Sequence, residues 1–322
     1  MSLSQYRLAR ITGALSAAAL NDVDIEEATG TPIQGSSERN GPETPRVELV
    51  DITEKSKGYG DQSQVYLTDS LHQAKENQGT YDEYALLLRR KVDKDGDAIS
   101  TALEIQSPVI RHALKQVLAS YSYLNLEARP ITIKQPYDAL FHYRKELRQY
   151  AESDDRSVEE KLHMSVLSKF MELNLRDTEA LYDQLIPNGK ITFSLLWTLF
   201  RAEDDILLQR ESFQECLRVI HCEQKTQDDA TFFEIESWRW GFNGAQFGPS
   251  MEKIRIPEFS STRRITQLKS FPLKMMPDRE RNALCEYLAE RGHKWKGYVN
   301  ISHKQYTGKT QVHSNGREVL TQ

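Results

Sequence analysis

The spacing of apolar residues in this chain changes near residue 205. Before this point they recur every three or four positions, as on a helix with one buried face. After it, apolar and polar residues alternate, and β-branched and aromatic side chains become common, as in strands. This pattern predicts helices at 108–118, 136–147, 158–173, 177–185 and 193–200, and strands at 206–208, 214–223, 231–242 and 251–256.

A β-hairpin is expected before the helices. Residues 84–92 and 98–106 flank the turn Asp-Lys-Asp-Gly-Asp, and Asp and Gly supply the backbone conformations of tight turns. A last helix is predicted at 278–291, where Gly292 ends it. The predicted fold class is therefore α+β, with an N-terminal β-hairpin and several helices, then a β-rich half closed by a C-terminal helix.

Length and composition predict four regions. The chain has 322 residues, and the stretch 29–45 is rich in Gly, Pro, Ser and Glu. Such a stretch has too little apolar surface to offset the entropy of ordering. We expect a disordered tail at 1–62, a hairpin plus helical region at 63–189, a β-rich region with its closing helix at 190–308, and a flexible tail at 309–322.

The composition also indicates an intracellular protein. No stretch approaches the ~20 consecutive apolar residues of a membrane-spanning helix. Cys216, Cys222 and Cys285 show no CxxC spacing, which favours free thiols in a reducing compartment. We therefore expect the cytoplasm or nucleus. The mitochondrion is the alternative, because the first 21 residues contain Arg7 and Arg10 and no acidic residue, as transit peptides do.

The net charge of −5 hides an uneven distribution. The segment from Lys253 to Arg317 has 14 basic and 5 acidic residues, a balance of +9, and the remainder has a balance of −14. This split predicts that the C-terminal part faces something acidic, which is its own N-terminal part, a second domain or a polyanion. An intramolecular or protein contact is favoured, since nucleic-acid domains are usually more strongly basic over one face.

Two short motifs resemble ligand loops but lack parts that the ligand needs. Residues 93–104 place acids at EF-hand positions 1, 3, 5 and 12, yet the glycine stands at position 4, where the loop needs it at 6. The flanking residues also favour strands over the two helices of an EF-hand. Gly308-Lys309-Thr310 lacks the first glycine of a phosphate-binding loop, and no strand precedes it and no helix follows.

Two further clusters of polar residues also fail to form a predicted site. The adjacent carboxylates of residues 203–205 point different ways, and we expect them in a solvated turn. Cys216, His221 and Cys222 lie close together, but no second pair of ligands follows at zinc-finger spacing. The sequence therefore predicts no catalytic, cofactor-binding or metal-binding residues, and a chain that is not an enzyme.

Basic and aromatic residues interleave in the C-terminal half. Trp238 and Trp240 are two apart, so on a strand they share a face. Such a composition suits phosphate contact and base stacking, and it also suits protein interfaces, where aromatic residues and Arg anchor contacts. We favour the protein interface. The candidate partner-binding residues are Trp238, Trp240, Arg263, Arg264, Lys294, Trp295, Lys304 and Tyr306.

Six short motifs, each present once, follow one another along the chain. They are LFHYR at 140–144, ITFSLLW at 191–197, IPEF at 256–259, FPL at 271–273, RGHKW at 291–295 and HKQYTG at 303–308. Together they resemble the uncharacterised N-terminal domain that precedes an AAA-type ATPase module in large fungal proteins. The resemblance covers residues 63–308. It implies a relation to an ATPase but no activity, because Walker A and Walker B motifs are absent from this sequence.

These observations lead to three hypotheses of function. The first is a non-catalytic recognition or adaptor domain that binds a protein partner or a substrate for an ATPase motor. The second is a subunit that docks onto a separately encoded AAA-type ATPase module. The third is a nucleic-acid-binding module that uses the basic 253–317 segment and loses affinity steeply with added salt.

Overall fold

The computed structural model describes residues 46–55, 64–67, 81–243, 246–297, 310–314 and 317–321. The chain divides into two compact units, which we describe separately. The first consists of Met1–Arg239 and Met251–Met275, and the second of Trp240–Ser250 and Met276–Gln322. The architecture is mixed α+β, as the sequence predicted. None of the described helices is long and apolar enough to cross a membrane.

The first sheet of the first unit has five strands in the order β2-β1-β3-β4-β5. Strand β1 pairs parallel with β3, and the other neighbours are antiparallel. The predicted hairpin is confirmed, and its turn is closed by the Asp93 carboxylate, which accepts bonds from the backbone N–H groups of Asp95 and Asp97. The strands are β1 (Arg46–Lys55), β2 (Gln64–Leu67), β3 (Tyr84–Val92), β4 (Ala98–Ile105) and β5 (Ile131–Lys134).

Strands form within both of the terminal segments that the sequence predicts to be tails. Residues 46–55, placed by the sequence analysis in a disordered tail, form β1, because their apolar side chains find a partner in β3. The predicted flexible tail at 309–322 contains an antiparallel pair, β13 (Thr310–Ser314) and β14 (Arg317–Thr321). Residues 1–45 lie outside the described residues, and so does the whole of HKQYTG at 303–308.

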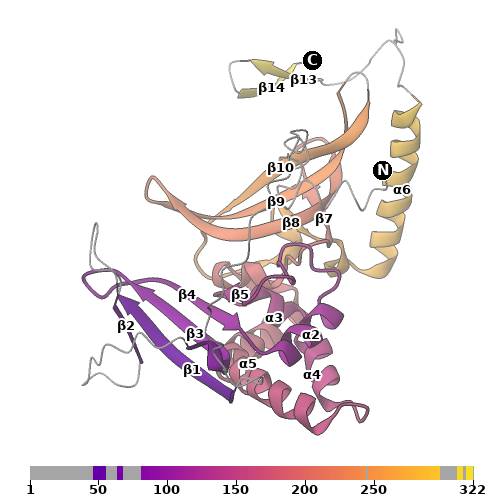
Figure 1. Ribbon diagram of the computed structural model, residues 1–322. Coiled ribbons are helices and arrows are strands. Elements are labelled where there is room, and N and C mark those ends of the chain that lie inside the picture. Colours follow the sequence, from indigo (N-terminus) through magenta and orange to yellow (C-terminus); the bar gives the residue numbers. More distant parts are fainter. Residues whose placement is uncertain are drawn as a thin grey trace, which may run out of the picture. The chain divides into compact units, whose positions relative to one another are not determined.

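Four helices pack beside the first sheet (Figure 1), and they bury its apolar residues in a common core. The core includes Leu86, Leu103 and Ile105 from the strands and Leu114, Phe141 and Phe170 from the helices. The helices are α2 (Pro108–Val117), α3 (Asp138–His142), α4 (Arg144–Glu152) and α5 (Val158–Leu185).

Helix α5 replaces two predicted helices. Its start is set by a capping box, in which the Ser157 and Glu160 side chains each accept from the other's backbone N–H. Residues 174–176 continue the helix, because Leu175 is buried and Asn174 donates to the Phe170 carbonyl. Helix α5 ends at Leu185, where the second of the two predicted helices ends, and η2 (Ile186–Asn188) follows it and ends at Gly189, which has a φ of 63°. The helix predicted at 193–200 is the 3-10 helix η3 (Phe193–Thr198).

The second sheet has the order β10-β9-β8-β7-β12. Its strands are β7 (Asp205–Gln209), β8 (Gln214–Gln227), β9 (Ala230–Phe242), β10 (Phe247–Pro257) and β12 (Ser270–Pro272). A two-residue loop joins β8 to β9, and Asp228 and Asp229 both have positive φ, as a type I′ turn requires.

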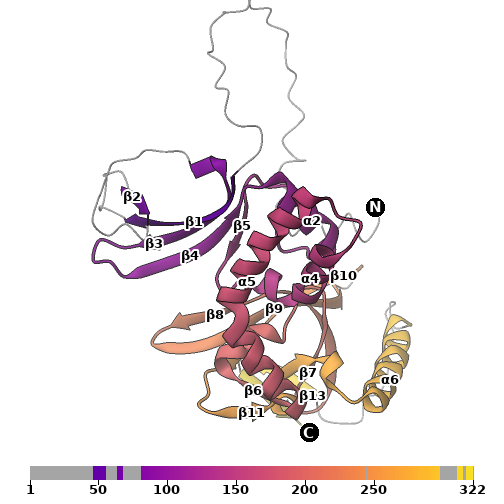
Figure 2. The ribbon, with the colours of Figure 1, turned by 90° about the horizontal axis from the view of Figure 1, so that it is seen from below.

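Short elements complete both units. In the first unit, β6 (Lys190–Thr192) pairs with β11 (Thr262–Arg264) at the end of α5 (Figure 2). The 3-10 helices η1 (Tyr81–Glu83) and η4 (Ile265–Gln267) lie between its strands in sequence, and η5 (Leu273–Met275) follows β12. The second unit holds the predicted last helix, α6 (Asp278–Lys296), which continues past Gly292 and ends at Gly297.

Candidate functional site

The eight predicted contact residues do not belong to one unit. Trp238, Arg263 and Arg264 lie in the first unit, and Trp240, Lys294 and Trp295 lie in the second. Lys304 and Tyr306 lie outside the described residues. Each group is therefore considered by itself, and the first unit supplies the better-defined surface.

That surface is the basic ribbon, which we define as β6 and β11, residues 190–192 and 262–264. The two strands are antiparallel, with Arg264 opposite Lys190 and Thr262 opposite Thr192. Directly opposite residues share a face of a sheet. The ribbon therefore presents two cations and two hydroxyl groups on one face, and all four side chains are exposed or half-exposed.

The backbone around the ribbon explains why so polar a pair of strands forms. Ile191 is fully buried, and Phe193, two residues further along the chain, is also buried. The Ile265 N–H donates to the Gly189 carbonyl at 2.9 Å and ties the two strand ends together. Gly189 and Ser261 both adopt positive φ at the boundaries of the strands. A buried anchor and two tight bends thus hold the charged face outward.

The charges of the ribbon are not balanced by carboxylates. Like charges directly opposite each other destabilise a sheet, so the Lys190–Arg264 pair costs free energy when no anion is near. No ion pair involves Lys190, Arg263 or Arg264 within the part of the chain that the structure describes. Arg263 instead places its guanidinium carbon 4.4 Å from the centre of the Phe259 ring. This contact holds Arg263 by a cation–π attraction and leaves its donors available.

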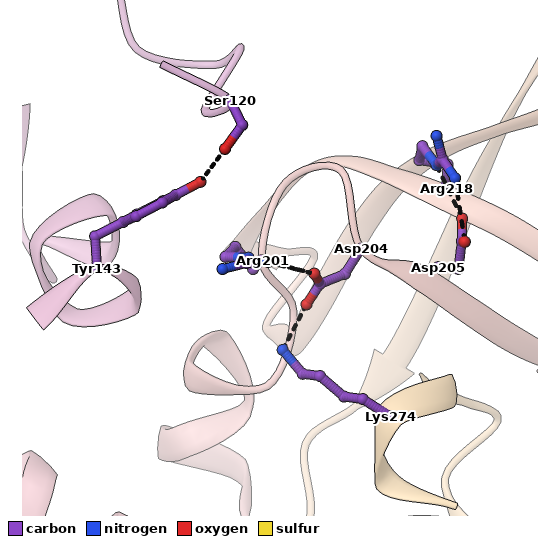
Figure 3. Close-up of polar contacts among 7 residues, drawn as sticks. All are labelled: Ser120, Tyr143, Arg201, Asp204, Asp205, Arg218 and Lys274. Atoms are coloured by element: carbon purple, nitrogen blue, oxygen red, sulfur yellow. Dashed lines mark hydrogen bonds and ion pairs between the residues drawn. The ribbon is translucent and has the colours of Figure 1, made fainter. Parts of the chain in front are cut away.

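Other cations of the same basic segment are already paired. Lys253 lies 2.7 Å from the Glu236 carboxylate, and Arg255 lies 2.9 Å from that of Glu234. Lys274 contacts Asp204 (Figure 3). The C-terminal excess of positive charge therefore does face an acidic part of the same chain, as one of the expected alternatives proposed, but only at these positions.

The tryptophans of β9 share a face, as expected from their spacing. Trp238 is half-buried and stands opposite Arg218 on β8. Arg218 in turn makes a two-bond contact with Asp205, at 2.8 and 3.1 Å (Figure 3). Trp240, two residues on, is 47% exposed.

In the second unit, Trp295 is partly a packing residue. Its ring meets the Phe247 ring edge to face, with the centres 4.8 Å apart, and Phe247 also contacts Phe242. Gly241 is required nearby, since a Cβ there would lie 2.9 Å from the Ser250 Cβ. Lys294 pairs along α6 with Glu290 at 2.8 Å. This arrangement explains Trp295 and Lys294 by local structure.

Two of the motifs in the sequence meet in the first unit. Phe141 of LFHYR packs against Trp197 of ITFSLLW, with ring centres 5.0 Å apart. The Trp197 carbonyl accepts a hydrogen bond from the His142 ring. Burial, together with the nearby cations Lys274 and Arg201, lowers the pKa of His142 to about 3, so the ring is neutral. Its Nε2 is buried and has no hydrogen-bond partner among the described residues.

The three carboxylates at 203–205 have different partners, and Figure 3 shows those of Asp204 and Asp205. Glu203 accepts from the Ser122 hydroxyl at 2.8 Å, and Asp205 pairs with Arg218. The expected solvated turn is wrong for Asp204, whose side chain is only 12% exposed and pairs with Arg201 and Lys274. Arg201 also lies over the Tyr143 ring, whose hydroxyl contacts Ser120 at 2.8 Å. The cluster therefore joins elements and does not converge on a substrate.

Two potential nucleophiles of the described part, Ser107 and Cys222, are buried and half-buried, respectively. Ser107 Oγ lies 2.9 Å from His163 Nδ1, but both residues are buried, and Ser107 Oγ accepts the Ile110 N–H as a helix cap. Burial raises the pKa of the Cys222 thiol, which keeps it protonated. Among the described residues, no three His, Cys, Asp or Glu side chains are grouped to hold a metal ion. The basic ribbon is therefore the candidate site.

Comparison with known proteins gives one match. Residues 181–277 match the model of a family described as a domain of unknown function (DUF7025). No curated protein and no solved structure matches this chain. The matched segment runs from the end of α5 past η5, so it contains both strands of the basic ribbon and Arg263 and Arg264.

Proposed function

We propose that this chain is a non-catalytic recognition or adaptor domain that binds an acidic segment of a protein partner at the basic ribbon. The proposal is carried by the opposition of Lys190 and Arg264, two exposed cations that have no carboxylate among the described residues. A bound carboxylate between them would turn a repulsive cross-strand contact into two attractive ones.

The chemistry of the ribbon favours carboxylates that arrive in an extended segment. Arg presents a planar fork of donors that matches a carboxylate, and Lys adds a point charge. Thr192 and Thr262 lie opposite each other at the other end of the ribbon, where their hydroxyl groups can donate to the same segment. Exposed ion pairs contribute about 0.2–1 kcal/mol each, so the affinity is modest and falls with added salt.

The resemblance to the N-terminal domain of AAA-type ATPases extends this proposal. In such a protein, a captured partner would be delivered to the ATPase module. A chain that instead docks onto a separate module would co-purify with it in a nucleotide-dependent way. That measurement separates the adaptor from the docking subunit.

Fluorescence anisotropy with a labelled deca-glutamate peptide tests the proposal. We expect binding at low salt by the wild-type chain and a loss of at least about tenfold in R263E/R264E, which corresponds to about 1.4 kcal/mol. The matched control is K161E/K169E, which reverses two exposed lysines of α5. Equal binding by both variants would contradict the proposal. Stronger binding of a single-stranded deoxythymidine decamer than of the peptide would favour the nucleic-acid alternative.

A further inference from the structure

We propose that residues 22–27 of this same chain occupy the basic ribbon when no partner is bound. The segment reads Asp-Val-Asp-Ile-Glu-Glu and precedes β1 in the sequence. This inference rests on the proposed function, because it takes the ribbon as a site for acidic segments. It adds a specific occupant and makes the site self-inhibited.

The charge pattern of the segment matches the ribbon. Asp22, Asp24 and Glu26 alternate with Val23 and Ile25. In an extended conformation the three acids would lie on one face, with about 7 Å between successive members. The ribbon offers Lys190 and Arg264 on its outer face, and Arg263, the next residue along β11, stands opposite the buried Ile191. An extended acidic segment is therefore the kind of ligand that this face fits.

Within residues 1–45, the segment also has the highest density of acidic residues. Residues 1–21 contain no acidic residue, and residues 28–45 contain only Glu38 and Glu43, whereas 22–27 contain four acids in six positions. The two apolar residues between them distinguish the segment from a plain acidic run. Within residues 1–45, charge alone therefore selects 22–27.

The connecting chain is long enough for this contact. From Glu27 to Arg46 an extended chain reaches roughly 60 Å. A compact body of about 200 residues, the size of the described part of the first unit, has a radius of gyration of only ~16 Å and a diameter below ~50 Å. The segment can therefore reach the ribbon from the start of β1.

Tethering makes a weak contact sufficient. A tether of this length gives an effective concentration on the order of millimolar, so a contact with a dissociation constant severalfold below that value is occupied in most chains. A partner supplied in trans must then compete with the segment. Its apparent affinity equals its intrinsic affinity multiplied by the fraction of chains whose ribbon is free.

Zero-length carbodiimide cross-linking of the full chain tests the contact directly, because it joins a carboxylate to an amine that touches it. We expect a product between Lys190 and residues 22–27 that is lost in high salt and reduced at least about fivefold in R263E/R264E. In the wild type and in R263E/R264E, the yield is compared with that of the exposed amine of Lys161. The control variant K161E/K169E lacks Lys161, so its yield is compared with that of the exposed Lys94. Cross-links from 22–27 that are spread evenly over the lysines and unchanged in R263E/R264E would overturn the proposal.

Mixing isotopically heavy and light chains separates the intramolecular contact from a contact between copies. Only heavy–heavy and light–light products are expected at low protein concentration. Mixed products that equal the unmixed ones would assign the ribbon to a second copy and overturn the proposal.

The competition is measured with the labelled deca-glutamate peptide. We expect D22N/D24N to bind it at least about threefold more tightly than the wild type, whereas E38Q/E43Q, which removes the same number of charges, binds it as the wild type does. Equal affinity in D22N/D24N and E38Q/E43Q would contradict self-occupation while leaving the proposed function intact. If no variant binds the peptide, the proposed function fails, and the Lys190 cross-link decides the inference alone.

Discussion

Basic residues gather on two surfaces of the first unit. On one surface carboxylates neutralise them, and on the other no carboxylate among the described residues does so. On the second sheet, Lys225, Lys253 and Arg255 surround the Glu234 carboxylate at 2.9, 3.5 and 2.9 Å. On the basic ribbon, Lys190 and Arg264 face each other without a carboxylate among the described residues.

The difference lies in what holds each group of cations in place. The three basic neighbours hold the pKa of Glu234 down to about 2, so the carboxylate stays ionised although it is only 2% exposed. Those cations therefore stabilise the sheet. On the ribbon, Lys190 and Arg264 make no ion pair among the described residues, and Arg263 lies over the Phe259 ring, which leaves the charges of all three for a ligand.

Removing the central carboxylate is the strongest way to break this comparison. Glu234→Ala leaves three cations around a site that carried the compensating charge, so we expect a loss of about 3 kcal/mol in the free energy of unfolding. Denaturant unfolding at neutral pH measures it. Because the folded pKa of Glu234 lies below its ordinary value of 4.5, wild-type stability is lost as the pH falls from 4.5 toward 2, and the difference from the variant should shrink over that range. A difference in the free energy of unfolding that stays constant over this pH range would contradict the ion pairs of Glu234.

Acidification tests a third arrangement, in which cations surround a neutral group. The folded pKa of His142 is about 3, against an ordinary value of 6.5. Between pH 6.5 and pH 3, His142 therefore carries a proton in the unfolded chain but not in the folded chain. The free energy of unfolding falls as the pH drops below 6.5. We expect His142 to cost about 2 kcal/mol at pH 5. His142→Asn should flatten the pH dependence between pH 6.5 and 5. An unchanged slope would show that other groups cause it.

Placing an acid in the ribbon sharpens the comparison in the opposite direction. Lys190→Glu puts a carboxylate directly opposite Arg264, so we expect a gain of about 0.5 kcal/mol in stability. The same change should weaken binding of the deca-glutamate peptide. Thermal unfolding and anisotropy on one preparation measure both effects. A loss of stability with unchanged binding would mean that Lys190 has a structural role.

The smallest effect is expected for the ribbon arginines themselves. R263A/R264A should change the free energy of unfolding by less than about 0.5 kcal/mol, as exposed residues without ion pairs do. The matched change on the second sheet, K253A/R255A, removes two partners of Glu234 and should cost about 1 kcal/mol. Parallel urea titrations of the two variants make the comparison. Equal losses would remove the distinction between the two surfaces.

Much of the fold follows from local patterns in the sequence. The β-hairpin around residues 93–97, the capping box at Ser157 and Glu160, and the stop at Gly189 each depend on a few neighbouring residues. Strand β1 was missed because its pairing partner, β3, lies beyond a long intervening segment. Helix α5 was divided in two because the burial of Leu175 depends on the core around it and not on neighbours in the chain.

The candidate site could be predicted only in part. Arg263 and Arg264 stood out as a basic pair near aromatic residues, and the structure places both of them on β11. Lys190 carried no signal, because it follows a turn and lies far from them in sequence. The aromatic candidates Trp240 and Trp295 belong to the other unit. The basic and aromatic residues that the sequence suggested as one surface are therefore divided between two units.

The sequence by itself determined the α+β class, the positions of most helices and strands, and the excess of positive charge in the C-terminal part, because each depends on the spacing or number of residue types. Only the tertiary structure decided which of those charges are neutralised. Lys253, Arg255 and Lys274 meet carboxylates from other strands and loops, while Arg264 meets Lys190. Pairing of this kind depends on the register between distant strands, and no local pattern of residues contains it.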